Sequence, residues 1–208
     1  MTDREINSEL PRTKGDKRVR TRAKLLEAAR KLIREKGYEH TTLEEIAERA
    51  GMTTGAIYGN FKSRDDLFIA LGQTYWAPIK PRVNPGASLV EVMRAMADAT
   101  IAAIPDRKDA AVGRLMGLAY TLANEEVREQ VVKITADSYA IGEQWLCTVV
   151  KKEELPMPPG QFVRVLHAMI EGLILQRLLT PELISDKVIR GAFTALATKC
   201  TGMNRPGR

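Results

Sequence analysis

The sequence predicts an all-α protein with a small N-terminal helix-turn-helix domain and a larger helical domain after it. Apolar residues recur at intervals of three and four along most of the 208-residue chain. No segment alternates apolar and polar residues with period two over a useful length, so strands are not expected. Capping residues, glycines and prolines divide the apolar pattern into segments of helical length.

The composition is that of an ordinary globular protein, with 44% hydrophobic and 28% charged residues. The apolar runs are too short to span a membrane and the N-terminus has no signal-peptide pattern, which predicts a cytoplasmic protein. The two cysteines, Cys147 and Cys200, match no metal or redox spacing. We therefore expect no metal and no cofactor, and two reduced thiols, with redox sensing as the alternative.

The net charge of +6 is concentrated at the N-terminal end of the chain. Residues 1–36 hold 12 Lys and Arg against 6 Asp and Glu, whereas residues 37–208 hold 20 of each kind. A polyanion such as DNA is the partner that this distribution indicates, although a basic tail can also serve solubility alone.

The first 62 residues divide into a tail and three helices. Residues 1–16 show no periodicity and are expected to form a mobile basic arm. An amphipathic helix follows from Lys17 and ends before Gly37. The run Thr42-Leu-Glu-Glu45 is a capping box that starts a second helix, which ends near Ala50.

A short third helix, residues 53–60, has the properties of a DNA-reading helix. Gly51 supplies the turn before it, Ile57 is its one inward anchor, and its other side chains are mostly small or polar. The helix contains no Arg, Lys or Gln, so only Thr53, Thr54 and Asn60 can bond base edges and we expect modest base discrimination. A plain helical hairpin with polar surface residues is the alternative interpretation.

The second domain, residues 63–208, begins with a helix from about residue 63 that runs to Pro78. Three prolines in residues 78–85 mark a loop or hinge. Helical patterns then cover residues 88–104, 109–123, 125–152, 161–179 and 185–199. The helix-turn-helix domain itself is assigned to residues 17–62.

The candidate DNA contacts are polar, basic or small residues of the first domain and its junction with the second. Lys62, Arg64 and the N-terminus of the second helix are placed to hold phosphates. The full set is Arg20, Arg22, Thr41, Thr42, Thr53, Thr54, Gly55, Ala56, Tyr58, Gly59, Asn60, Lys62 and Arg64.

The run Thr41-Thr-Leu-Glu-Glu-Ile-Ala-Glu-Arg-Ala-Gly-Met-Thr-Thr-Gly-Ala-Ile-Tyr-Gly-Asn-Phe-Lys-Ser-Arg-Asp-Asp-Leu67 resembles the signature of the TetR (tetracycline-repressor-like) family. With the basic helix before it, the resemblance covers residues 17 to about 76. It implies a nine-helix homodimer with a DNA-binding head and a variable ligand-binding body. It also implies phosphate contacts from Thr42, Tyr58 and a lysine at the start of the fourth helix. Here that position holds Arg64, with Lys62 two residues earlier.

Met, aromatic and polar side chains in the middle helices suit a pocket for a small lipophilic or aromatic effector. Each of them could instead be plain core, and Gly113 and Gly117 fit either a ligand or close helix packing. The candidate pocket residues are Tyr75, Trp76, Met93, Met96, Thr100, Met116, Tyr120, Tyr139, Gln144 and Trp145.

The last two helices carry more apolar surface than one hairpin needs to hide, which favours a two-fold four-helix dimer interface. Burial against other helices of the same chain is the alternative. The candidate interface residues are Phe162, Leu166, Met169, Leu173, Ile174, Arg177, Val188, Phe193 and Leu196.

The sequence thus predicts a bacterial transcriptional regulator that binds a palindromic DNA operator and is released by an effector. Such a repressor would associate with the nucleoid when bound to DNA. An activator or co-repressor-dependent regulator of the same fold is a second hypothesis. An all-α enzyme with a DNA-binding head is a third, but no catalytic constellation of Ser, His, Asp or Cys supports it. A non-specific architectural DNA-binding protein is the remaining alternative.

Overall fold

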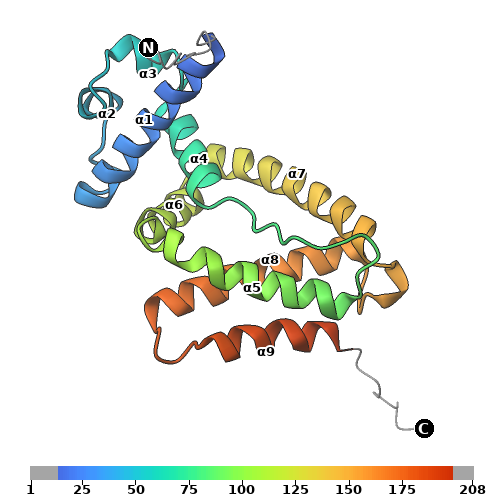
Figure 1. Ribbon diagram of the computed structural model, residues 1–208. Helices are drawn as coiled ribbons and strands as arrows, with labels where there is room; N and C mark the ends of the chain where they lie inside the picture. The colour runs from blue at the N-terminus through green and yellow to red at the C-terminus, as the bar shows by residue number, and fades with distance from the viewer. Residues whose placement is uncertain (1–13, 199–208) are drawn as a thin grey trace, which may run out of the picture. The chain divides into compact units, whose positions relative to one another are not determined.

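The computed structural model describes residues 14–198 and divides the chain into two compact units. We call Met1–Gln73 the head and Thr74–Arg208 the body. All regular structure in the described part is helical, with nine α-helices and one 3₁₀ helix, so the all-α prediction is confirmed (Figure 1). None of these helices is long and apolar enough to cross a bilayer.

The head contains α1 (Lys14–Lys36), α2 (Leu43–Arg49), α3 (Thr54–Tyr58) and most of α4 (Arg64–Tyr75). Helices α2 and α3 pack against each other and both pack on α1. Their core is made of apolar side chains that are nearly inaccessible to solvent, with Leu25, Ile46, Ile57, Phe61 and Leu67 at its centre. The predicted helix-turn-helix elements are therefore present, each within a few residues of its predicted bounds.

Helix α1 begins three residues earlier than the sequence predicts. Residues 14–16, which we assigned to the basic arm, belong to α1, with Asp16 in its first turn, where an acidic side chain favours the helix dipole. Residues 1–13 of the predicted arm lie outside the described residues.

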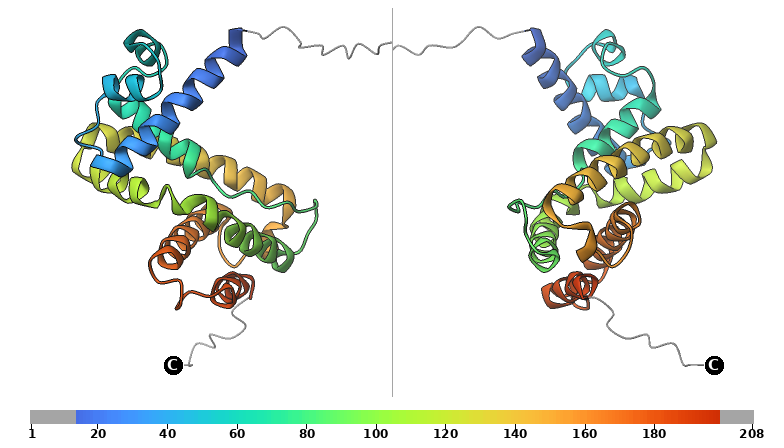
Figure 2. Two further views of the ribbon diagram at one scale, coloured as in Figure 1. Left: turned by 60° about the vertical axis from the view of Figure 1, so that its left-hand side comes forward. Right: turned by 90° about the vertical axis from the view of Figure 1, so that its right-hand side faces the viewer.

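The body contains α5 (Leu89–Lys108), α6 (Ala111–Ala123), α7 (Glu125–Val149), the 3₁₀ turn η1 (Lys152–Glu154), α8 (Pro159–Leu179) and α9 (Asp186–Ala197). Helices α8 and α9 both pack on α5, while α7 packs on α8 and on α6 (Figure 2). The connection from α4 to α5 is extended, and Ile79, Val83 and Ala87 in it pack against the core. The centre of the body is thus α5.

The last turn of α5 continues through Pro105, whereas the sequence places the end of that helix before the proline. Pro105 has no backbone N–H, so the last turn of α5 lacks one of the usual i to i−4 hydrogen bonds. Arg107 explains the continuation. Its side chain is 6% exposed and donates to the carbonyl of Ala77 in the α4–α5 connection at 2.5 Å, which holds the last turn in place.

The predicted dimer face on α8 and α9 requires correction. Phe162, Ile174 and Phe193 are completely buried and Leu166 nearly so, all within the body's own core. The excess apolar surface covers α5, which lies against both helices. Arg177 is also engaged within the chain, donating to Asp186 at 2.8 Å and to the carbonyl of Ile184. Of the predicted interface residues, those with accessible surface are Met169, Leu173, Arg177, Val188 and Leu196.

Candidate nucleic-acid interface

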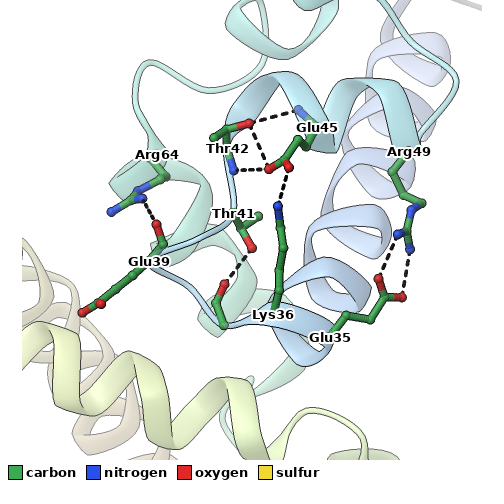
Figure 3. A network of polar contacts seen from close by, with 9 residues as sticks. Glu35, Lys36, Glu39, Thr41, Thr42, Glu45, Arg49 and Arg64 are labelled. Atoms are coloured by element: carbon green, nitrogen blue, oxygen red, sulfur yellow. Dashed lines mark hydrogen bonds and ion pairs between the residues drawn. The ribbon is translucent and has the colours of Figure 1, made fainter.

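Two ion pairs and a capping box fix α2 against α1 (Figure 3). Arg49 donates to both carboxylate oxygens of Glu35, at 2.9 and 2.8 Å. Lys36 pairs with Glu45, and Glu45 also accepts from the backbone N–H of Thr42 at 2.9 Å. In return the Glu45 N–H donates to the Thr42 hydroxyl at 3.2 Å, so the predicted capping box is present. Both ion pairs are partly exposed, so they orient α2 but add little to the free energy of folding.

The Glu45 carboxylate is held ionised by this arrangement. Hydrogen bonds from Lys36 and from the Thr42 backbone lower the pKa of Glu45 to about 2. The Thr42 hydroxyl, a predicted phosphate contact, is exposed but already serves the cap. A phosphate at this helix N-terminus would have to coexist with the Glu45 charge.

The turn between α2 and α3 has the conformation that the sequence predicts. Gly51 adopts φ +66°, in the left-handed region, and donates to the carbonyl of Glu48 at 2.9 Å. The Thr53 hydroxyl then caps α3 by accepting from the Ala56 N–H at 3.3 Å. Ile57 is 0% exposed and anchors α3 to the head, as predicted.

The opposite face of α3 is open to solvent. Ala56 is half-buried, and the exposed residues there are Thr53, Thr54, Gly55, Tyr58 and Gly59. The Tyr58 hydroxyl donates to Glu44 on α2 at 2.9 Å. This bond raises the pKa of Tyr58 and, after a backbone hydrogen bond, is the next largest cause of the lowered pKa of Glu44. Tyr58 is thus pre-oriented at the edge of the open face.

Asn60 and Arg22, both predicted DNA contacts, already make hydrogen bonds within the head. The Asn60 amide donates to the carbonyl of Ala56 at 2.8 Å, and its own side-chain oxygen is buried without a partner. Arg22 donates to the Asn60 carbonyl at 2.8 Å, and its guanidinium lies 4.3 Å from the centre of the Phe61 ring. Both side chains hold the turn after α3, which leaves Thr53 and Thr54 as the side chains suited to base edges.

Lys62 and Arg64 differ in how far the head already uses them. Arg64 donates to the carbonyl of Glu39 at 3.3 Å and stacks over the Tyr38 ring at 4.5 Å. The Lys62 side chain is exposed, and within the described residues no carboxylate lies within ion-pair distance of its ammonium. Its backbone N–H donates to Asp66, which fixes the residue at the start of α4. Of these two cations, Lys62 is thus the one that the described part of the head does not already engage.

The two remaining predicted contacts, Thr41 and Arg20, differ in their exposure to solvent. Thr41 is 2% exposed and its hydroxyl donates to the Gly37 carbonyl at 2.7 Å, so it supports the loop before α2. Arg20 is exposed on α1. The sequence pattern did not show that Thr41 is buried while Arg20 is exposed, because the burial of a threonine depends on tertiary packing.

The predicted pocket residues of the body are largely core. Trp76, Met93, Met96 and Thr100 are buried, and the Thr100 hydroxyl donates to the carbonyl of Met96 in its own helix. Gln144 is exposed; half-buried are Tyr75, Met116, Tyr120, Tyr139 and Trp145. The polar groups expected to orient an effector thus differ in exposure, since Thr100 is buried, the tyrosines are half-buried and Gln144 is exposed, and the pocket stays a prediction.

A different polar group in the body was missed by the sequence analysis. Trp76 donates to Glu171 on α8 at 2.6 Å, and Arg114 on α6 pairs with the same carboxylate at 3.1 Å. Arg107 lies over the Trp76 ring at 4.9 Å, and His167 is 3.8 Å from Glu171. We call these five residues the body charge cluster. A signal was available, since Glu171 interrupts an otherwise apolar stretch of α8.

With this geometry established, comparison with known proteins identifies the head. Residues 25–71 match the family described as bacterial regulatory proteins, tetR family. The head is a TetR-family domain. The resemblance that the Thr41–Leu67 motif indicates is therefore confirmed, and the match ends within α4.

Curated relatives of the TetR-family head are named as transcriptional regulators. The HTH-type transcriptional repressor AcnR of Corynebacterium efficiens is 40% identical over 82 residues, which cover 39% of this chain and 43% of AcnR. The chain thus spans less than half the length of this relative.

Solved structures extend the similarity of fold to the body. NalD, the secondary repressor of the MexAB-OprM multidrug efflux pump in Pseudomonas aeruginosa, is 28% identical with a TM-score of 0.52, covering 86% of this chain and 95% of NalD. GusR of Salmonella enterica is 19% identical with a TM-score of 0.65, covering 89% and 97%, and shows the fold alone.

Proposed function

We propose that this protein is a sequence-specific transcriptional repressor that binds a palindromic operator as a homodimer and is released by a small effector bound in the body. The observation that carries the proposal is the open face of α3. Thr53, Thr54 and Gly55 are exposed on a five-residue helix that Ile57 pins to a TetR-family head. Small side chains on that face allow the backbone of a reading helix to lie deep in the major groove.

Phosphate contacts would flank α3 on both sides. Lys62 supplies an unpaired ammonium, and Tyr58 supplies a hydroxyl whose present acceptor, Glu44, would be exchanged for a phosphate oxygen. Arg20 on α1 adds an exposed cation. Because direct readout rests on two threonines, DNA shape and phosphate contacts would supply much of the affinity.

Repression is preferred over activation because AcnR and NalD are both named repressors. DNA binding places the action of the protein in the bacterial cytoplasm, at the nucleoid. We propose a regulatory and not an enzymatic role, because AcnR and NalD are both named as repressors. The dimer interface would use the accessible apolar residues of α8 and α9, including Val165 and Val188, which are 40% and 43% exposed.

The function is tested by selecting bound sequences from randomised duplexes and footprinting the protein on the selected DNA. A regulator of this kind should enrich an inverted repeat and protect two half-sites about one helical turn, or a multiple of it, apart. Enrichment of no sequence, with protection spread evenly along the duplex, would instead indicate a non-specific architectural protein.

The matched control is a change on the same helix. Thr54→Val keeps the shape of the side chain and removes its hydroxyl, and should alter the enriched sequence without unfolding the head. An unchanged sequence preference in Thr54→Val, with normal affinity, would place the readout elsewhere.

A further inference from the structure

The body charge cluster joins residues from four parts of the chain. Trp76 follows α4 directly, Arg107 lies in the last turn of α5, Arg114 lies on α6, and His167 and Glu171 lie one turn apart on α8. Tyr139 on α7 closes the group, with its hydroxyl 2.9 Å from the Nδ1 of His167. Such a meeting of charges inside a helical body has a cost, because each charged group loses water.

The cluster holds more positive than negative charge. Glu171 is the one carboxylate, and it already serves Arg114 and the Trp76 N–H. Arg107 has no carboxylate within ion-pair distance among the described residues and bonds only the Ala77 carbonyl, although its side chain is more than nine-tenths buried. Two guanidiniums therefore face a single carboxylate.

His167 adds no negative charge and little positive charge at neutral pH. Burial lowers its pKa below the usual value, and the positive charges of Arg114 and Arg107 lower it further against the opposing effect of Glu171. The Nε atom of Arg114 is buried without a hydrogen-bond partner. An unsatisfied buried donor next to an excess cation is a position that an anion would occupy favourably.

We propose that the effector of this protein is a small organic carboxylate whose carboxylate group binds between Arg107 and Arg114. This inference rests on the proposed function and specifies its ligand. A guanidinium binds a carboxylate through two parallel N–H donors, which suits the free Nε of Arg114 and the uncompensated charge of Arg107. Trp76 and Tyr139 line the same group and would contact the apolar part of the ligand.

The cluster is open enough for a ligand to reach it. The side chains of Arg114, Glu171 and His167 are 26%, 17% and 43% exposed, so the group is not sealed inside the core. The carboxylate would compete with Glu171 for Arg114 and with the Ala77 carbonyl for Arg107. Glu171 also accepts from Trp76, and the Arg107 contact holds Ala77, so both competing groups touch the two residues that follow α4. Ligand binding would therefore act on the segment that leads back to the TetR-family head.

The experiment uses the full chain and matched ligand pairs that differ in charge alone. The pairs are phenylacetate with phenylacetamide and decanoate with decanamide, measured by calorimetry and by operator anisotropy. At least one carboxylate should bind about tenfold or more tightly than its amide and should lower operator affinity. Equal binding within both pairs, or no binding of either carboxylate at about 1 mM, would overturn the inference.

Two substitutions separate the cluster from general charge effects. Arg114→Gln should abolish the preference for the carboxylate, whereas Arg94→Gln, an exposed position on α5, should keep it. Arg114→Lys, which retains the charge but has no Nε donor, should keep part of the preference. A preference that is the same in Arg114→Gln and in the unaltered protein would rule out this site.

Trp fluorescence gives a second readout that does not depend on DNA. The chain has two tryptophans, so Trp145→Phe leaves Trp76 as the reporter, and carboxylate binding should change its emission. Operator binding by the ligand-free protein is measured first. Its absence would contradict the proposed function, whereas normal operator binding without carboxylate discrimination contradicts the ligand inference alone.

Discussion

At the scale of single residues, Lys62 and Arg64 show how similar charges acquire different roles. Arg64 is held by the Glu39 carbonyl and the Tyr38 ring, while the Lys62 ammonium faces solvent. Lys62→Gln should therefore weaken operator binding on all sequences alike and reduce the slope of log K against log salt by about 0.9, the value for one phosphate contact. Anisotropy titrations at several salt concentrations measure both quantities.

The matched control for Lys62 is Arg64→Gln. This change should mainly lower the melting temperature of the head, because it removes the contacts to Glu39 and Tyr38. If Arg64→Gln lowered the slope of log K against log salt by about 0.9 and Lys62→Gln left it unchanged, Arg64 would be the phosphate contact instead of Lys62.

His167 belongs to the same scale, because one proton on it changes the charge balance of the body. Its folded-state pKa is lowered, first by burial and then by Arg114 and Arg107, against Glu171. The unfolded chain then takes up the proton near pH 6.5 and the folded chain only at lower pH. The free energy of unfolding should fall as pH falls from 6.5 through the lowered folded pKa. His167→Gln should flatten that part of the stability curve, measured by urea unfolding between pH 5 and 7.5.

The titratable and charged groups that face His167 are Tyr139, Glu171, Arg107 and Arg114. The control variant measured alongside is His40→Gln, a histidine that is exposed in the head and lies outside the body charge cluster. Identical pH dependence in His167→Gln and the unaltered protein would contradict the lowered pKa.

At the scale of elements, the glycines around α3 separate stability from DNA binding. Gly55 has room for a methyl group, whose nearest neighbour would be the Thr53 hydroxyl at 3.9 Å. Gly55→Ala should stabilise α3 by about 0.5–1 kcal/mol, because alanine loses less backbone entropy than glycine in a helix. The same methyl should weaken operator binding, because it stands on the face that meets the groove. Thermal unfolding and anisotropy measure the two effects independently.

Gly51→Ala is the matched variant for this element. Its φ of +66° makes any side chain strained although space is free, so it should destabilise the head by roughly 1–2 kcal/mol. Higher stability together with unchanged operator affinity in Gly55→Ala would indicate that this face of α3 does not enter the groove.

The same elements show how much the sequence could predict. Local chemistry determines the capping box at Thr42, the left-handed Gly51 and the anchor Ile57, and all three were predicted. Thr41 and Asn60 could not be placed, because their hydrogen bonds depend on how the loop and turn fold back. In the body, an apolar stripe such as that of Phe162 and Ile174 is equally compatible with a core and an interface. The position of α5 decides between them: α8 and α9 both pack on it, so this stripe is core.

At the scale of the whole molecule, the remaining question is which surface pairs two copies of the chain. The body leaves two sets of apolar residues accessible: one on α8 and α9, including Val165 and Val188, and one on α6 and α7, including Leu122 and Ile141. Under the proposed function the first set would form the interface, because a two-fold pairing of α8 and α9 with their copies fits the two-fold symmetry of a palindromic operator. Leu122 is 80% exposed, so the second set could also form the dimer interface.

The two surfaces are distinguished by charge substitutions that leave the monomer core untouched. Val165→Glu with Val188→Glu should yield monomers in sedimentation and weaken operator binding by at least about tenfold, since one half-site contact is lost. Leu122→Glu with Ile141→Glu should remain dimeric with normal affinity. All four side chains are exposed by 40% or more, so each variant should unfold at nearly the normal temperature. If the second pair gave monomers and the first remained dimeric, α6 and α7 would form the interface, and the cluster residue Arg114 on α6 would then stand beside the partner copy.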